Sequence, residues 1–527
     1  MTGCLRTLSA LILIALFAAP IKAFPAADHL TSQSRPAAGG PVRSVQSSNG
    51  APNQAALEIT LVEAILMALE NNRSLALQRI APAITQSFEE EARAAFDPVL
   101  SAGAHTQRSQ GRVSSAPGRT TDSLVGTSHH GFIALDSFFP AGTWVSAEAS
   151  TSRTDSDFQN DALASTRLGV SVSQALLRGF GRDVNLALLR QARLETDISR
   201  YELQGFSEAL VAQVETLYWD YALFLREIEI VQESLKLAEQ QLADTEAMIA
   251  VGAMAEAELP AVQAEAALQR QGLINVKKAL AANRLRLLRL LNPPREHLWD
   301  LEITLVHPPA IPEVTLAAVE SYVASGLHRR PEIHQARLAM ARGDLEVVRT
   351  KNGLLPRLDL FVNLGKSGYA DSFGGTASDL GGDGYDTLAG FNFEFPLVNR
   401  GARARHQRAL SEREQAEKAL ENLTQLIEWD VREAYLEVNR TREQIAAGAA
   451  TRQWQEEKVR IEVEKFRVGR STNLLVAQAQ RDLLVSRIGE VRSVVEYLQA
   501  LTTLYRLEGS LLERRGIRLP SDDTPLR

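Results

Sequence analysis

Apolar residues in the second half of the chain recur at helical spacing over a very long stretch. From about 402 to 468 there is no proline and hardly any glycine, and the same holds from about 183 to 250. Steps of three and four residues join one apolar seam in the later stretch: Ala416, Leu420, Leu423, Ile427, Val431, Ala434 and Val438. Such spacing places the seam on one face of an amphipathic helix. Each stretch therefore predicts a helix of about 100 Å at 1.5 Å per residue, which is typical of a tube or a stalk.

Both long stretches end at a Val-Gly pair, and a second helical run follows each pair. The pairs lie in "EAMIAVGAMAEAELPAVQAEAAL" (246–268) and "EVEKFRVGRSTNLLVAQAQRDLL" (462–484). Glycine inside a helix costs about 1 kcal/mol relative to alanine, whereas at a helix end it supplies the positive φ of a turn. We therefore predict that Gly252 and Gly469 form the tips of two helical hairpins. The N-cap of the second return helix is one of three residues: Ser471, Thr472 or Asn473. A single rod with a tolerated glycine is the alternative.

Segments that alternate between apolar and polar residues lie before the long helices in each half. In "PRLDLFVNLG" (356–365) and "RLGVSVSQALLRGFG" (167–181) the alternation is typical of strands with one apolar face. Two such strands in each half predict about four principal strands. In the first half, further alternating segments, 131–138 and 142–150, flank "FFPAG", and we interpret them as an added hairpin in an external loop. Prolines and glycines mark the strand-to-helix transitions: Pro98, Gly179, Pro356, Pro396 and Gly401.

The two halves follow the same plan, which indicates an internal duplication. "ITLVEAILMALENNRSLALQ" (59–78) is echoed by "VTLAAVESYVASGLHRRPEIHQ" (314–335), and each leads through a proline-marked break into strands and then a long helical hairpin. The predicted divisions are a first repeat at 57–291, a linker at 292–312, a second repeat at 313–516 and a tail at 517–527.

The N-terminus has the features of a secretory signal peptide. Arg6 precedes a short apolar run, 8–19, and Ala23 is a plausible cleavage point. We predict removal of 1–23. A retained anchor is the alternative, although the run is shorter than the ~20 residues of a spanning helix. The segment 24–56 is rich in Ala, Ser, Gly, Pro and Gln, which predicts a disordered leader.

Composition and motifs argue against several classes of protein. The only cysteine is Cys4, inside the predicted signal peptide, so the exported chain would have neither disulfides nor thiolate metal sites. A net charge of -7 without a basic block gives no sign of nucleic-acid binding. We find no G-x-S-x-G, Walker loop, H-E-x-x-H or G-x-G-x-x-G before a helix, and therefore expect no enzyme, cofactor or metal.

Two further signals have a plain structural interpretation. "GGDGYDTLA" (381–389) fits a calcium β-roll repeat, but such sites form between stacked copies, and a single copy favours an external loop. Three tryptophans in the helical stretches are expected to pack in helical cores: Trp219, Trp429 and Trp454.

The predicted strands have one face apolar enough for lipid and one polar enough for a water-filled lumen. Four strands are too few for a transmembrane barrel, whose smallest examples have about eight, and lipid does not tolerate open sheet edges. If these strands span a membrane, several protomers must share one barrel. A trimer would supply about twelve strands.

Together, these features resemble the TolC-like outer-membrane efflux proteins. The resemblance covers about 59–516 and rests on the duplicated plan and on "RRPEIHQARLAMARGDLEVVRTKNGLLPRLDL", "SVSQALLRGFGRDVNLALLRQARLE", "FEFPLVNRGARA" and "FRVGRSTNLLVAQAQRDLL". It implies a mainly α protein with β structure: long α-helical hairpins that form a tunnel across the periplasm, and a twelve-stranded barrel that a homotrimer shares in outer-membrane lipid.

The resemblance also implies partners. Such proteins are passive exit ducts of tripartite efflux pumps or type I secretion systems, and they dock onto a periplasmic adaptor (membrane fusion protein) and an inner-membrane pump of RND or ABC type. In this family the hairpin tips engage the adaptor, which implies a docking role for five residues: Val251, Gly252, Val468, Gly469 and Arg470. The competing hypothesis is a periplasmic coiled-coil scaffold or adaptor without a pore. The duplicated, proline-led strand pairs favour the channel, because a scaffold should not need them.

A gate at the tunnel mouth is a further implication of the resemblance. Some relatives narrow the mouth with acidic residues after the second tip, whereas "RSTNLLVAQAQ" here contains Asn473 and no carboxylate before Asp482. Glu256 and Glu258 follow the first tip. They either contribute to such a gate or form a solvated helix face.

Overall fold

The computed structural model describes residues 56–113, 122–156, 163–295 and 297–517, which belong to one compact unit that begins at Gln54. The predicted signal peptide, nearly all of the predicted leader and the tail beyond residue 517 lie outside the described residues. Within the described ranges, no helix combines the length and the apolar character needed to cross a membrane.

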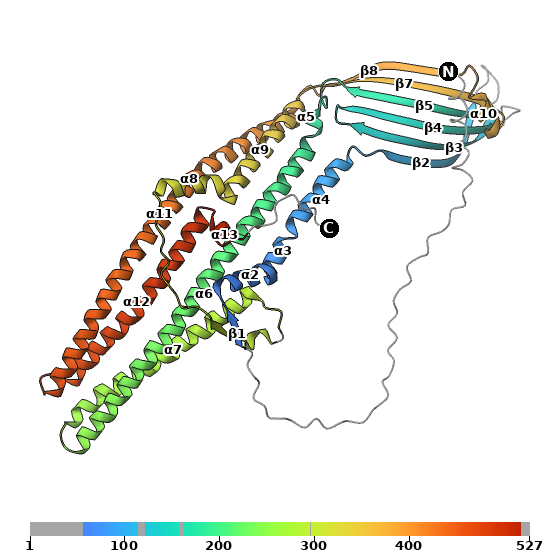
Figure 1. Ribbon diagram of the computed structural model, residues 1–527. Helices are drawn as coiled ribbons and strands as arrows, with labels where there is room; N and C mark the ends of the chain where they lie inside the picture. The colour runs from blue at the N-terminus through green and yellow to red at the C-terminus, as the bar shows by residue number, and fades with distance from the viewer. Residues whose placement is uncertain (1–55, 114–121, 157–162, 296, 518–527) are drawn as a thin grey trace, which may run out of the picture. The chain divides into compact units, whose positions relative to one another are not determined.

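Two long helical hairpins make up most of the helical part (Figure 1). The first joins α6 (Ala187–Ala250) to α7 (Leu259–Leu291), and the second joins α11 (Arg400–Arg467) to α12 (Asn473–Leu507). The two hairpins pack against each other through α6 and α12. The predicted turns at the Val-Gly pairs are therefore confirmed, and the alternative of a single rod is wrong.

Shorter elements pack along the hairpins. The strands β1 and β6 pair in parallel, α4 and α9 pack on α6, and α8 and α9 pack on α11. The short elements of the helical part are β1 (Ala56–Ile59), α2 (Leu61–Asn71), α3 (Arg73–Gln78), α4 (Ala81–Ala94), α5 (Arg182–Asn185), η1 (Glu256–Glu258), η2 (Leu298–Asp300), β6 (Glu302–Leu305), α8 (Val319–Arg329), α9 (Pro331–Asn352) and α13 (Leu511–Arg514). One further short helix, α10 (Phe373–Asp379), packs on the sheet instead.

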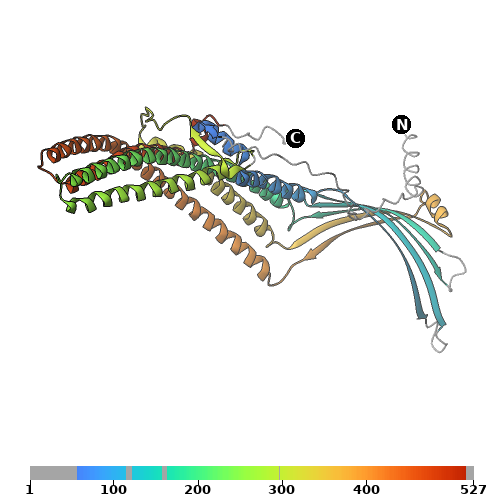
Figure 2. The ribbon, with the colours of Figure 1, turned by 90° about the horizontal axis from the view of Figure 1, so that it is seen from below.

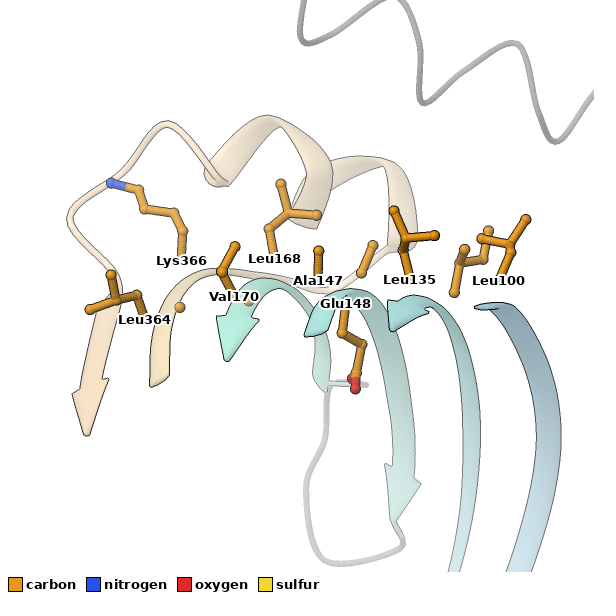
Figure 3. Close-up of a pocket in the computed structure, with 12 residues that line it drawn as sticks. Leu100, Leu135, Ala147, Glu148, Leu168, Val170, Leu364 and Lys366 are labelled. Carbon is orange, nitrogen blue, oxygen red and sulfur yellow. The ribbon is translucent and has the colours of Figure 1, made fainter. Parts of the chain in front are cut away.

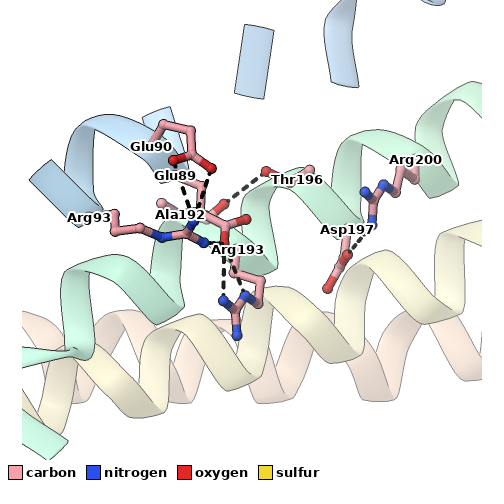
Figure 4. Close-up of polar contacts among 8 residues, drawn as sticks. All are labelled: Glu89, Glu90, Arg93, Ala192, Arg193, Thr196, Asp197 and Arg200. Atoms are coloured by element: carbon pink, nitrogen blue, oxygen red, sulfur yellow. Dashed lines mark hydrogen bonds and ion pairs between the residues drawn. The ribbon is translucent and has the colours of Figure 1, made fainter. Parts of the chain in front are cut away.

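Charged side chains join α4 to α6. Arg193 of α6 lies 3.1 Å from the carboxylate of Glu89 on α4, and Arg93 of α4 lies 3.2 Å from the same carboxylate (Figure 4). One carboxylate therefore holds two guanidinium groups from neighbouring helices. This contact fixes α4, the helix that leads into the sheet, against α6.

The core lies where the two hairpins meet. Its fully buried side chains include Tyr218 of α6, Leu287 of α7 and Leu504 of α12. The predicted seam of α11 also enters the core, through four buried residues: Ile427, Val431, Ala434 and Val438. The prediction that the three tryptophans pack in the core is wrong for two of them. Trp219 packs against the core, but Trp429 and Trp454 are exposed.

A buried ion pair joins the two halves inside the core. Glu215 of α6 is fully buried, and its carboxylate accepts hydrogen bonds from Arg515 at 2.6 and 2.7 Å. The hydroxyl of Thr502 on α12 donates to the same carboxylate at 2.7 Å. A buried charge is tolerated where its oxygens are satisfied in this way.

The remaining strands form one antiparallel sheet (Figure 2). Its spatial order is β2-β3-β4-β5-β7-β8, and every neighbouring pair is antiparallel. The strands are β2 (Val99–Val113), β3 (Asp122–Phe139), β4 (Thr143–Ser156), β5 (Leu163–Ala175), β7 (Arg357–Ala370) and β8 (Tyr385–Glu394).

The prediction of about four strands with an added hairpin in an external loop is corrected to six strands in one sheet. The segments 131–138 and 142–150 belong to β3 and β4, in the interior of the sheet. Residues 140–142, the last three of "FFPAG", form the turn between them, where Gly142 has a positive φ of 88°. The turn contacts the link between β5 and α6, because Asn185 donates a hydrogen bond to the Pro140 carbonyl at 3.0 Å. It therefore lies at the helical end of the sheet.

Candidate functional site: the hairpin tips and the two faces of the sheet

The first hairpin tip is a glycine turn at the end of α6. Gly252 has a φ of 72°, in the left-handed region. Its N–H donates to the Ile249 carbonyl at 2.9 Å, and the N–H of Ala253 donates to the Met248 carbonyl at 2.8 Å. This pair of bonds is a Schellman motif, which satisfies the last carbonyls of the helix.

The second tip repeats the same turn at the end of α11. Gly469 has a φ of 73°, its N–H donates to the Phe466 carbonyl at 2.9 Å, and the N–H of Arg470 donates to the Lys465 carbonyl at 2.8 Å. A Cβ at either tip glycine would have no atom within 4 Å. Backbone conformation, not lack of space, is therefore what requires glycine at both tips.

Each turn exposes one apolar side chain. Val251 is 79% exposed and Val468 is 68% exposed. Charged residues surround the second valine: Arg467 pairs with Glu464 at 2.9 Å, and the hydroxyl of Ser471 donates to Glu462. The tips therefore combine an exposed valine with a fixed backbone, which suits recognition by another protein.

Beyond the turns the two tips differ. After Gly469 the chain enters α12 directly, and the Thr472 hydroxyl caps the helix by accepting from the Leu475 N–H at 3.4 Å. After Gly252 the chain first forms η1, and α7 then begins with Pro260 in its first turn and no side-chain cap. Of the three candidate N-caps, Thr472 is the one used.

The two tips are linked through Asn473. This side chain is 1% exposed, and its carbonyl accepts from Gln241 of α6 at 3.1 Å. Its amide group donates to Glu258 at 3.3 Å and contacts the sulfur of Met254 at 3.5 Å. The structure thus brings together two of the three predicted gate residues, while Glu256 is exposed. Sequence reasoning missed Gln241 and Met254, because nothing local marks a contact across more than 200 residues.

The predicted strand-to-helix transitions lie at the junctions between sheet and helices. Pro98 and Pro356 directly precede β2 and β7, Gly179 lies between β5 and α5 with a φ of 88°, and Pro396 follows β8. Gly401 is the second residue of α11, just after Asn399, which has a φ of 45°. The left-handed turn into α11 is therefore made by an asparagine.

Register gives the sheet two chemically different faces. Leu100, Leu135, Val170 and Leu364 lie on one face, and Glu148 points to the other (Figure 3). These four apolar side chains are exposed and surround a shallow depression. The opposite face carries polar and charged side chains: His105, His130, Glu148, Arg167, Asn363 and Asp386.

An ion pair crosses the polar face. Arg167 of β5 reaches Asp386 of β8 at 2.6 and 3.1 Å, above Gly365 of the intervening strand β7. A Cβ at Gly365 would lie 2.3 Å from the carboxylate and 2.6 Å from the guanidinium. Asp386 is the second aspartate of the "GGDGYDTLA" segment, and its carboxylate is engaged by arginine. The described residues contain no cluster of three or more His, Cys, Asp or Glu side chains suited to a metal ion.

The whole plan of the chain matches a known family. Residues 64–293 and 323–510 match the sequence model of the outer membrane efflux protein family. The chain belongs to the outer membrane efflux protein family. It is similar to the pyoverdine export outer membrane protein OpmQ of Pseudomonas putida, with 27% identity over 370 residues, which cover 68% of this chain and 74% of that protein.

Solved structures of efflux channels have the same fold. The outer-membrane channel OprN superposes with a TM-score of 0.64 at 17% identity, covering 85% of this chain and 89% of that chain. The CmeC outer membrane channel of Campylobacter jejuni gives a TM-score of 0.62 at 16% identity, covering 86% of each chain. At such identities the similarity supports the fold.

Membership of the outer membrane efflux protein family, the TolC family, establishes what the protein is at a general level. It is an outer-membrane efflux channel that extends into the periplasm, with a helical tunnel and a β-barrel, and it is a transport protein without enzymatic activity. TolC-family channels form trimers and act with other components of efflux pumps. The predicted family, location and general fold are confirmed.

Proposed function

We propose that this channel is the passive exit duct of a tripartite efflux pump or type I secretion system. Its tips would dock onto a periplasmic adaptor, and the adaptor would connect it to an inner-membrane pump of RND or ABC type. The observation that carries the proposal is the duplicated turn. Val251-Gly252 and Val468-Gly469 present the same backbone and the same exposed side chain on two neighbouring hairpins. One repeated element of an adaptor could therefore bind both.

A homotrimer accounts for the exposed apolar side chains of the long helices. Trp454, Ile461 and Leu436 of α11 are exposed, as are Ile274 and Leu285 of α7. Exposed apolar stripes of this kind mark protein interfaces. In a closed tunnel, α11 of one protomer would lie beside α7 of the next and cover both stripes. The neighbouring protomer would then cover Trp429 and Trp454, which are exposed in the single chain.

We further propose that the apolar face of the sheet contacts outer-membrane lipid and that the polar face lines the lumen. A charged side chain facing lipid near the middle of the bilayer costs about 2–4 kcal/mol. The polar face holds Arg167, Glu148 and Asp386, whereas the opposite face holds leucines, valines and one charged residue, Lys366, whose ammonium donates a hydrogen bond to the Gly382 carbonyl at 2.6 Å. The opposite orientation would therefore be strongly unfavourable.

The gate proposal centres on the contact between the tips. Asn473 and Glu258 belong to different hairpins, and their hydrogen bond links the starts of the two return helices. Opening the mouth would require the hairpins to separate and this bond to break. Glu256 is exposed and would contribute charge at the entrance without taking part in the bond.

For the chain as a whole we propose export through the signal peptide 1–23, a leader segment at 24–56 and two repeats at 57–291 and 313–516 joined by the linker 292–312. The tail, 517–527, follows the second repeat. The competing function, a periplasmic scaffold without a pore, has no use for a six-stranded sheet with one exposed apolar face.

Fractionation tests the proposed function directly. Full-length protein should be extracted by detergent from the outer-membrane fraction as a trimer that dissociates on heating. Cross-linking in cells should join residues near Val251 and Val468 to a periplasmic partner. A soluble periplasmic monomer would contradict both the channel and the trimer.

A further inference from the structure

Two strands of the sheet have no counterpart in the helical part. At the helical end, α4 leads into β2, β5 leads into α5 and α6, α9 leads into β7, and β8 leads into α11. The strands β3 and β4 are instead joined to each other by the short turn at 140–142. The sheet of one protomer is therefore wider by one hairpin than its four connections to helices require.

This hairpin is long enough to cross a membrane. β3 has 18 residues and β4 has 14, against 13 for β5 and 14 for β7. A tilted transmembrane strand needs about 9–11 residues. Residues 143–154 of β4 are paired on both sides, with β3 and with β5. The hairpin is thus an integral part of the sheet.

The hairpin also continues both faces of the sheet. Leu135 and Ala147 stand on the apolar face, in one row with Leu100 and Val170 of the flanking strands. Glu148 stands on the polar face. In a hairpin that lay in water outside the membrane, polar residues would be expected to interrupt the exposed apolar band.

The turn of the hairpin is anchored at the helical end. The Gly181 N–H donates to the Ala141 carbonyl at 3.2 Å, and the Ala175 N–H donates to the Gly142 carbonyl at 3.0 Å. A Cβ at Gly142 would lie 2.3 Å from the Gly179 carbonyl oxygen. Close backbone contact therefore fixes the turn at the level where the other strands meet their helices.

We propose that three protomers close a barrel of eighteen strands, in place of twelve. This inference rests on the proposed trimer. Neighbouring strands alternate in direction, so the two edge strands of a six-stranded sheet, β2 and β8, run in opposite directions. β8 of one protomer can therefore pair antiparallel with β2 of the next, just as the two edges of a four-stranded sheet could. The open edges of each sheet then disappear, as a lipid environment requires.

The added strands widen the lumen. With strands about 4.8 Å apart and tilted by about 40°, twelve strands give a backbone diameter of about 24 Å and eighteen give about 36 Å. Side chains on both walls remove about 10 Å of each diameter, which leaves about 14 Å and about 26 Å. The barrel would admit cargo that a twelve-stranded barrel excludes, and size selection would fall to the helical tunnel.

Cysteine labelling tests the width, because Cys4 is the only cysteine of the sequence and lies in the predicted signal peptide. Ser150→Cys lies on the polar face and its neighbour Ala149→Cys on the apolar face. In intact cells we expect Ser150→Cys to react with a small maleimide and with a maleimide-linked polymer about 20 Å across. Ala149→Cys, facing lipid, should react with neither. Three outcomes would overturn the proposal: Ser150→Cys fails to react with the polymer, Ser150→Cys fails to react with the small maleimide, or both variants are labelled equally.

Deletion of the hairpin provides the matched comparison. Removal of residues 122–156 leaves β2 to pair directly with β5. Polymer labelling of Ser171→Cys on the polar face of β5 should then fall by about tenfold or more, while labelling by the small maleimide is retained. Electron cryo-microscopy of full-length trimers should count eighteen strands. A count of twelve in an intact trimer would refute the wide barrel alone, whereas absence of any trimer would refute the proposed function.

Discussion

The two halves of the protein share their helical plan and differ in their sheet. Tyr218 of α6 and Tyr435 of α11 lie at the same distance from the tip glycines, and so do Val214 and Val431. Both helices end in the same turn. Yet the first half supplies four strands and the second supplies two. A tunnel helix cannot change length without losing its core register, whereas an antiparallel sheet accepts a hairpin because the other strands keep their directions.

The largest expected effect on export comes from breaking the shared turn. Valine at Gly252 or Gly469 must adopt a left-handed backbone, which costs about 1–2 kcal/mol for an L-residue. We expect Gly252→Val and Gly469→Val each to reduce pump-dependent export by about tenfold while the trimer still forms. Export assays and heat-dependent gel mobility provide the two measurements.

Two controls accompany the tip variants. Asparagine tolerates the left-handed region, so Gly252→Asn should retain most export. Gly489 lies inside α12 with open space around it, so Gly489→Ala should be neutral or slightly stabilising. Normal export in both valine variants would show that the tips are not the docking surface.

The next effect tests the junction between the halves. Glu215→Gln removes the charge that the Arg515 guanidinium faces inside the core, and breaking such a buried pair costs about 3 kcal/mol. The exposed pair of Glu464 and Arg467 is the control, because Glu464→Gln should cost less than about 0.5 kcal/mol. Denaturant unfolding of the purified trimers measures both. Equal effects would mean that the buried pair is not what joins the halves.

A difference between the long helices α6 and α11 themselves is electrostatic. Burial raises the pKa of the Glu208 carboxyl to about 7, and Glu332 nearby acts in the same direction. At the same distance from the tip, α11 carries Gln425. Because native Glu208 keeps a proton that the unfolded chain releases near pH 4.5, its contribution to stability is full below that pH and is lost as the pH rises to about 7.

Glu208→Gln should therefore flatten the dependence of stability on pH. We expect it to raise the free energy of unfolding at pH 8 by up to about 3 kcal/mol and to leave the value at pH 4.5 unchanged. Glu202→Gln, at an exposed position of the same helix, provides the matched control. An unchanged pH profile in Glu208→Gln would contradict the assignment.

The smallest expected effect concerns the link between the tips. Glu258→Ala removes one hydrogen bond, which contributes about 1 kcal/mol, and Asn473→Ala removes that bond together with the one from Gln241. Both should increase the conductance of purified trimers in planar bilayers, and the double variant should add little because the two residues act on one bond. Glu256→Ala should leave the conductance unchanged. Fully additive effects would show that the residues act independently.

The helices and the tips could be predicted because their signals are local. The spacing of Ile427, Val431 and Val438 identifies the buried face of α11 without knowledge of its partner. A glycine that follows a long helical stretch identifies the turn, because few other residues adopt a positive φ. Both signals depend on residues a few positions apart.

The strand count and the contacts of Asn473 could not be predicted in this way. The alternation in 131–138 and 142–150 indicates strands, but it does not show which strands pair. Asn473 meets Gln241 only after the two hairpins pack. Periodicity likewise places Trp429 and Trp454 on an apolar face without showing whether the same chain or a neighbouring protomer covers that face.

The space above Gly365 has a consequence for the history of this sequence. An alanine there would place its methyl carbon closer than van der Waals contact to both members of the Arg167–Asp386 pair, so the ion pair and the glycine depend on one another. A lineage that lost the arginine or the aspartate would be free to place a larger residue at 365. In an alignment of relatives, these three positions should vary as a set, and the covariation would mark β5, β7 and β8 as neighbours without any structure.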